Sequence, residues 1–371
     1  MPSLQPNLGP DRAARAGALD ALRLSAAVFI VLYHFGSSAP IDLTGTYAFL
    51  GRGWLATDFF IILSGYVLGR AHGDALDRRE LSPQRFLLKR LARVWPAHLI
   101  VLFALAVMVL AAGLIGLPAD SPERFQATDF IQQALLIHAW GGSVQPSWNE
   151  PSWTLSALVA CYALFPLIWL AGRPMLGRGA ALAAGFGLML TAALLSPGLL
   201  GGSLFDLPFH QGVLRAVPLF VMGALTARFV QGRTFSRAAA VASTLAALGA
   251  LVCAQATERT EFSALACMAA LITLIVSAEG LALRRTRWVK AGAGMAFALF
   301  ITHAVTGTVW FSLMQALGVQ TSWLSWFGAW AAVVTVAAAF HRFVDQPIQS
   351  RLNGLLTPRR EQTQTDAPRL A

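Results

Sequence analysis

Charged residues are scarce in this chain. Of its 371 residues, 12% are charged and 56% are hydrophobic, and the mean hydropathy is +0.59. A water-soluble fold of this length needs a more polar surface, so the composition excludes one. The sequence therefore predicts a membrane protein without a soluble domain of useful size.

Cysteine is also rare, and its placement excludes two further classes. Cys161, Cys253 and Cys267 lie in apolar stretches without the spacing of a disulfide framework or a zinc site, so we interpret them as packing residues. The histidines form no recognisable ligand set, and we predict no metal. No internal repeat is evident. A cleavable signal is not expected either, because the first apolar run continues through Arg23 and His34.

Long apolar runs dominate what is present. A window of about 20 residues predicts an all-α, polytopic membrane helix bundle of about ten transmembrane helices. The predicted spans are 17–36, 53–69, 95–117, 152–171, 180–200, 212–230, 238–256, 262–281, 292–315 and 322–343. We place the membrane domain at 17–345 and a cytoplasmic tail, disordered at its end, at 346–371.

Basic residues alternate along the loops in the way that separates cytoplasmic from external segments. They gather before the first span, between the second and third, and near 173–178, 228–237, 284–290 and 342–360. Both termini are therefore predicted to be cytoplasmic, in a multi-pass protein of the inner (plasma) membrane. The segment 128–140 is too short and polar to span, and we predict an external interfacial or re-entrant helix there.

The net charge of +10 fits the same topology. Basic cytoplasmic loops anchor a membrane protein against anionic lipid, which makes membrane lipid an expected partner. Nothing in the pattern requires nucleic acid, and we expect none as a partner.

Arg23 and His34 lie within one apolar stretch, where ionisable side chains are costly and usually functional. If the stretch is helical, a rise of ~1.5 Å per residue separates them by ~16 Å along the axis. Arg23 then lies near one membrane face and His34 lies deep toward the other. The pair predicts chemistry inside the membrane.

Polar motifs follow one another in a characteristic order. They are Asp20 and Arg23 with His34, GWLATDFFIILSGYVLGR at 53–70, KRLARVWP at 89–96, WNEPSWTLSALVACYALFPL at 148–167, LRAVPLFVMGAL at 214–225, ALFITH at 298–303 and FVDQPIQ at 343–349. In this order they resemble the membrane proteins of acyltransferase family 3. The resemblance covers about residues 18–350.

Two positions depart from the pattern of that family. The acidic residue that usually follows its Ser-x-Ser element is replaced by Leu158, and the usual Gly before Pro-Ser-Trp is Glu150. Glu150 is a candidate for the missing carboxylate. Glu150 precedes Leu158 by eight residues, however, so its side chain need not face the cavity that a carboxylate at position 158 would face.

The resemblance implies transfer of an acyl group, commonly acetyl from acetyl-CoA, to a hydroxyl of a carbohydrate or another secondary product. His34 is then the candidate general base, since an imidazole titrates near neutrality. Asp58 is the candidate partner that orients it, and Arg23 completes the predicted catalytic set. Two alternatives stay open: His34 satisfies a neighbouring helix, or Asp58 pairs with an in-span arginine such as Arg215.

The donor is expected to arrive from the cytoplasm, because CoA phosphates do not cross hydrocarbon. Its predicted ligands are the basic residues Arg85, Lys89, Arg90 and Arg93. The alternative is that these charges only hold the loop inside. Acetyl-CoA is expected as a substrate, and no permanently bound cofactor is predicted.

The predicted substrate-binding residues combine aromatic and polar groups. They are Trp148, Trp153, Tyr162, Arg215, His303 and Glu150. The aromatic residues alternatively form a membrane-interface belt, and His303 an interhelical hydrogen bond. Ser64 and Gly65 are interpreted as packing residues rather than as an acyl-serine site. We expect acceptor choice to reside in the external segment 118–151.

Three functions follow as hypotheses. The leading one is an O-acetyltransferase that modifies an envelope or exported glycan. A lipid-linked glycan is one candidate acceptor. A glycan or proton-coupled transporter is the second, although transporters often show repeated halves. The third is an inactive partner in polysaccharide assembly, suggested by Leu158.

Overall fold

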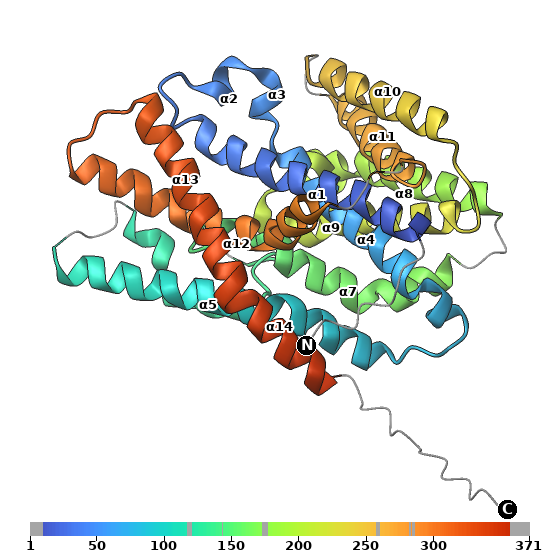
Figure 1. Cartoon of the computed structure of the whole chain (residues 1–371), viewed down its shortest axis with the longest axis horizontal. Coiled ribbons are helices and arrows are strands. Elements are labelled where there is room, and N and C mark those ends of the chain that lie inside the picture. Colours follow the sequence, from blue (N-terminus) through green and yellow to red (C-terminus); the bar gives the residue numbers. More distant parts are fainter. Residues whose placement is uncertain are drawn as a thin grey trace, which may run out of the picture.

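The structure, a computed structural model, describes residues 10–356 apart from 117–120, 143, 173–176, 257–259, 282 and 284–285. Every regular element in this part is helical (Figure 1). The predicted disordered end of the tail lies outside the described residues. So do several charges of the loop pattern, namely Asp120, Arg173, Glu258, Arg259, Arg284 and Arg285.

The long helices coincide with the predicted spans. They are α1 (Pro10–Gly36), α4 (Trp54–Asp77), α5 (Pro83–Leu114), α7 (Trp153–Ala171), α8 (Arg178–Leu200), α9 (Gly212–Val230), α10 (Arg237–Ala256), α11 (Glu261–Ser277), α12 (Arg287–Ala316) and α13 (Trp323–Phe340). Within the described ranges, eight segments are long and apolar enough to cross a membrane, compared with the ten predicted. The two that differ are α4, which is not among the eight, and α11, which is a shorter apolar helix. The predicted all-α polytopic membrane bundle is confirmed.

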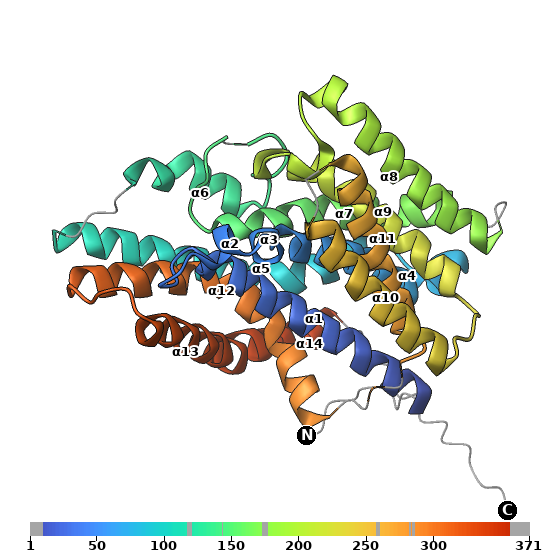
Figure 2. The ribbon, with the colours of Figure 1, turned by 90° about the horizontal axis from the view of Figure 1, so that it is seen from above.

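The segment before α7, which was predicted to be external, forms only short helices in its described part. These are η1 (Pro122–Phe125), α6 (Ala127–Ala134) and η2 (Glu150–Ser152). α6 occupies the first part of the predicted non-spanning helix, and turns follow it. Figure 2 shows α6 and α13 on opposite sides of α5 and α12. The remaining short elements are α2 (Leu43–Thr46), α3 (Ala48–Gly51), η3 (Leu204–Asp206) and η4 (Phe209–Gln211).

The C-terminal helices run on without a loop. Ser322 and Ser325 form a capping box that starts α13. α13 continues through the π-helix η5 (His341–Asp345) into α14 (Gln346–Leu356), which packs against α5. Single-turn π-helical segments occur frequently at functional sites.

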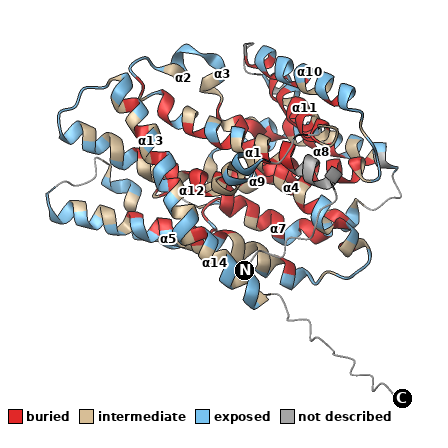
Figure 3. Cartoon of the chain, viewed as in Figure 1, coloured by how far each residue is buried: buried red, intermediate tan, exposed pale blue. Residues whose placement is uncertain are grey.

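The centre of the bundle is built on close contact between α4 and α9. The burial colouring of Figure 3 shows many buried residues along both helices, as it does along α7 and α11. A Cβ added to Gly65 would lie 2.1 Å from the Phe220 carbonyl oxygen, and one added to Gly223 would lie 1.9 Å from the Ile62 carbonyl oxygen. Small residues thus let the two backbones approach, as proposed for Gly65 from the sequence.

A larger residue at this crossing is expected to destabilise the bundle. Gly223→Val must push α9 away from α4, and overpacking of this kind costs about 1–3 kcal/mol. The thermal midpoint in detergent should fall accordingly. Gly249→Val in α10 is the matched control, because nothing lies within 4 Å of a Cβ added there. Equal midpoints for the two variants would contradict the packing role of Gly223.

Candidate active site

His34 lies at the junction of two cavities. One, of about 260 Å³, is lined by His34, Arg124, Trp148 and Glu150 among others. The other, of about 510 Å³, is lined by His34, Glu150, Trp153 and Arg215 among others. The imidazole is accessible rather than enclosed by apolar side chains. The alternative of a buried, purely structural histidine is therefore disfavoured.

His303 packs beside this imidazole. The two ring centroids are 5.0 Å apart. Nδ1 of His303 lies 2.7 Å from the Phe300 carbonyl oxygen and 3.2 Å from that of Leu299. A carbonyl oxygen only accepts, so Nδ1 carries the proton and Nε2 of the neutral ring is an acceptor. Nε2 is buried and has no hydrogen-bond partner among the described residues.

The two cavities that His34 lines are called the outer cavities below. Four of the predicted substrate-binding residues line them with His34: Trp148, Glu150, Trp153 and Arg215. Trp148 adopts a positive φ of 40°, uncommon for a bulky residue. Its ring lies 5.2 Å from Phe125 and 5.0 Å from Phe130, and its Nε1 donates to the Gln126 carbonyl at 2.9 Å. These contacts fix the indole at the cavity wall.

Glu150 faces both cavities, although it was uncertain from the sequence that it would. Its Oε2 lies 3.4 Å from Arg124, and its side chain is 39% exposed. Leu158, at the position where an acidic residue was expected, is buried in the hydrophobic core. Glu150 is therefore the carboxylate that lines the cavities with His34.

Asp58 differs from its predicted role. Its two carboxylate oxygens accept hydrogen bonds from Arg215, at 2.9 Å from Nε and 2.7 Å from Nη2. Both side chains are almost fully buried, and the guanidinium also lies 5.0 Å from the centre of the Trp54 ring. The alternative pairing that the sequence left open is thus the one found. A carboxylate in a membrane core needs a cation more than it needs an imidazole.

A separate, inner cavity of about 110 Å³ lies along α1. It is lined by Arg23, Ser64, Arg90 and Tyr162 among others. Arg23 also contacts Asp20 at 3.2 Å. Tyr162, predicted to bind the same substrate as Trp148 and Trp153, lies with the basic residues instead, because α7 carries it several turns away from Trp153.

Aromatic rings lie between the inner cavity and His34. Phe60 lines the inner cavity, and its ring centre is 6.0 Å from that of Phe300. The Phe300 ring lies 6.2 Å from that of His303, which contacts His34. A chain of ring contacts thus joins the wall of the inner cavity to His34.

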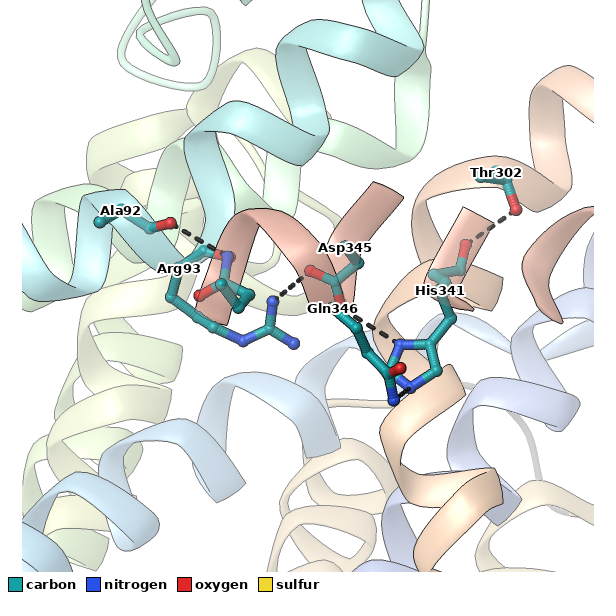
Figure 4. A network of polar contacts seen from close by, with 8 residues as sticks. Ala92, Arg93, Thr302, His341, Asp345 and Gln346 are labelled. Atoms are coloured by element: carbon teal, nitrogen blue, oxygen red, sulfur yellow. Dashed lines mark hydrogen bonds and ion pairs between the residues drawn. The ribbon is translucent and has the colours of Figure 1, made fainter. Parts of the chain in front are cut away.

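Arg93 is held by a second network, shown in Figure 4. Its guanidinium donates to Asp345 at 2.7 Å, and the other carboxylate oxygen lies 3.2 Å from Nδ1 of His341. Gln346 lies 3.1 Å from Nε2 of that ring, and Gln349 donates to the carbonyls of Ala92 and Arg93. The network joins α5 to η5 and α14.

The four predicted donor ligands therefore separate. Arg90 lines the inner cavity, and its Nε is buried without a hydrogen-bond partner among the described residues. Arg93 is paired with Asp345, Arg85 is exposed, and Lys89 is partly exposed. Of the four predicted donor ligands, Arg90 is thus the one that lines the inner cavity.

A buried hydrogen-bond network that the sequence did not predict holds the connection from α5 to α7, which is called the outer loop below. Gln133 Nε2 donates to the Ser147 carbonyl at 2.7 Å, and its Oε1 accepts from the Asn149 amide at 3.2 Å. Asn149 Nδ2 donates to the Ile301 carbonyl at 3.1 Å, two residues before His303. Burial lowers the pKa of the adjoining His138 to about 3, so it is neutral at ordinary pH. The loop is thereby tied to α12.

Metal ligation gains no support from the described part of the chain. No three His, Cys, Asp or Glu side chains in it are grouped so that they could hold an ion.

The sequence model of a family described as "Acyltransferase domain" matches residues 17–342. The chain belongs to this family, acyltransferase family 3. By family and fold it is therefore a multi-pass membrane protein of this family. The resemblance inferred from the order of the motifs is confirmed.

Curated relatives match parts of the acyltransferase chain. Protein 2 in the picA locus of Rhizobium radiobacter is 35% identical over 111 residues, which cover 30% of this chain and 54% of that protein. The acyltransferase MdmB of Streptomyces mycarofaciens is 27% identical over 165 residues, covering 43% of this chain and 40% of MdmB. The matches thus span about half of these relatives or less. No solved structure matches the chain.

Proposed function

We propose that this acyltransferase moves an acetyl group from acetyl-CoA to a hydroxyl of a carbohydrate in the outer cavities. The proposal depends on one observation: His34 is reachable from two cavities that it shares with Glu150, whereas Arg23 and Arg90 line a separate one. Donor and acceptor can thus approach from opposite ends of α1. The inner membrane is the location that suits a cytoplasmic donor and an exported acceptor.

The chemistry proposed at His34 is general-base catalysis. The acceptor hydroxyl gives its proton to the imidazole as its oxygen attacks the thioester carbonyl. The C–S bond then breaks, and the proton passes to the sulfur to give free CoA. The His303 ring packs beside the His34 ring, and its Nε2 is a hydrogen-bond acceptor. It can accept a hydrogen bond from an N–H of His34 or from the attacking hydroxyl, and so orient either group.

Trp148, Trp153 and Glu150 supply the means to hold the acceptor. An indole offers an apolar face on which a sugar ring stacks, and a carboxylate accepts hydrogen bonds from hydroxyls. Arg215 lines the larger cavity but is occupied by Asp58, so we assign it to the architecture of the site.

Arg90 is proposed to bind the donor phosphates. Arg90→Gln should raise the KM for acetyl-CoA about tenfold with a smaller change in kcat, because a charge-assisted hydrogen bond is worth about 1.5–3 kcal/mol. Arg78→Gln is the matched control, since this arginine pairs with Glu80 on the surface at 2.9 Å. If the charges served topology alone, the two variants would have the same KM.

Purified protein in detergent tests the function itself. Radiolabelled acetyl-CoA and a neutral oligosaccharide should yield labelled acceptor and free CoA without any ion gradient. A carrier or an inactive assembly partner would produce neither. Incubation with acetyl-CoA alone separates direct transfer from an acyl-enzyme relay, since only the relay leaves a labelled protein.

A further inference from the structure

A third outer cavity adjoins the two that His34 lines. Its volume is about 490 Å³, and it lies between the end of α1 and the connection from α12 to α13. Ser38 and Phe311 line both this cavity and the 260 Å³ cavity of His34. Ser37 is shared with the 510 Å³ cavity. The three cavities are therefore neighbours that share walls.

The lining of this third cavity is polar but uncharged. None of the described residues around it carries a charge, and its hydrogen-bonding side chains are the hydroxyls and carboxamides of Ser37, Ser38, Gln315, Gln320, Thr321 and Ser325. Phosphates and carboxylates are bound by arginine or lysine, so this lining does not suit an anion. Hydroxyls and carboxamides both donate and accept, which matches the hydroxyls of a neutral sugar.

The walls of the cavity are held in place before any ligand binds. Nε1 of Trp326 donates to the Phe35 carbonyl at 2.9 Å and ties α13 to α1. The Phe311 ring packs edge-on against Phe35 with centroids 5.3 Å apart. Gly318 ends α12 with a φ of 68°, a conformation that glycine adopts without strain. A preformed site costs little ordering on binding.

We propose that this cavity is a second acceptor subsite, which binds a neutral sugar unit of the same glycan beyond the unit that is acetylated. The inference rests on the proposed function and names its acceptor class: a neutral oligosaccharide of at least two units. A volume of about 490 Å³ lies within the ordinary range of small-molecule sites, so the cavity accommodates a ligand portion of its own.

A length series of acceptors tests the proposal. With neutral glucose oligomers of one to six units, the kcat/KM of the unaltered protein should rise once a second or third unit is present. Gln315→Ala/Gln320→Ala should lower kcat/KM about tenfold for the longer acceptors, because two hydrogen bonds are lost. Transfer to the monosaccharide should stay unchanged. Thr321→Trp, which fills the cavity, should have the same selective effect.

Gln84→Ala is the matched control, since Gln84 is exposed at the start of α5 and lines none of these three cavities. Equal kcat/KM for all lengths, or a length dependence that survives both variants, would overturn the subsite. Oligomer binding, followed by tryptophan fluorescence, is measured separately. Binding that both variants weaken, without transfer in any of the proteins, would refute the proposed function while supporting the subsite.

Discussion

Replacing His34 with alanine is expected to reduce acetyl transfer by roughly 10²–10⁴-fold, the usual contribution of a general base. The imidazole lines both outer cavities and packs on His303, so it is placed to take a proton from a hydroxyl bound in either cavity. The loss should appear in kcat. Initial rates of CoA release from the purified protein, at saturating donor and acceptor, measure it.

His34→Gln separates proton transfer from hydrogen bonding. Glutamine keeps polar atoms near the same place but cannot accept a proton at neutral pH, so its rate should be as low as that of His34→Ala. The thermal midpoint in detergent should stay near that of the unaltered protein for both. His72→Gln, at the opposite end of the bundle beside Phe86, is the matched control and should retain activity. Full activity of His34→Ala would refute the mechanism.

The position of each group along a helix could be predicted from the sequence. Hydropathy located the long helices, and an eleven-residue separation placed Arg23 and His34 at different depths. The structure accordingly puts them in different cavities. Depth is predictable because the helical rise per residue is fixed.

The partner with which each charged side chain pairs could not be predicted in the same way. Arg90 and Arg93 are three residues apart on one helix, yet the first lines the inner cavity and the second binds Asp345, 252 residues later. Which cation meets which carboxylate depends on how helices far apart in the sequence pack, and no local pattern records that. Tyr162 was misplaced for a different reason: it lies on the same helix as Trp153, and the helical rise over that separation already places the two side chains at different depths.

The outer-loop network was missed on other grounds. Gln133 and Asn149 are neutral residues in a polar segment, where they do not stand out as His34 does in an apolar one. Their importance follows only from burial, since a buried carboxamide must find partners. The placement of Trp148 and Glu150 depends on those partners, because Asn149 lies between them and is bound to Gln133 and Ile301.

Breaking the Asp58–Arg215 pair is expected to have the largest effect on stability. Removal of one member leaves a buried, uncompensated charge, which typically costs about 3–5 kcal/mol. Asp58→Asn and Arg215→Gln should each lower the thermal midpoint in detergent substantially, because the side chains are only 0% and 7% exposed. The double variant Asp58→Asn/Arg215→Gln should recover part of the loss, since it buries no net charge.

The same variants decide between the two roles of Asp58. If it orients His34, as the sequence suggested, Asp58→Asn lowers kcat at an unchanged thermal midpoint, and Arg215→Gln does not reproduce the effect. If it serves as the counter-ion of Arg215, as its two hydrogen bonds indicate, the variants act alike on stability and only the double variant restores it.

Glu80→Gln, which breaks the exposed pair with Arg78, is the control for stability. It should change the thermal midpoint little, because surface pairs contribute about 0–1 kcal/mol. A buried ion pair that joins α4 to α9 thus holds one wall of the cavity that His34 lines.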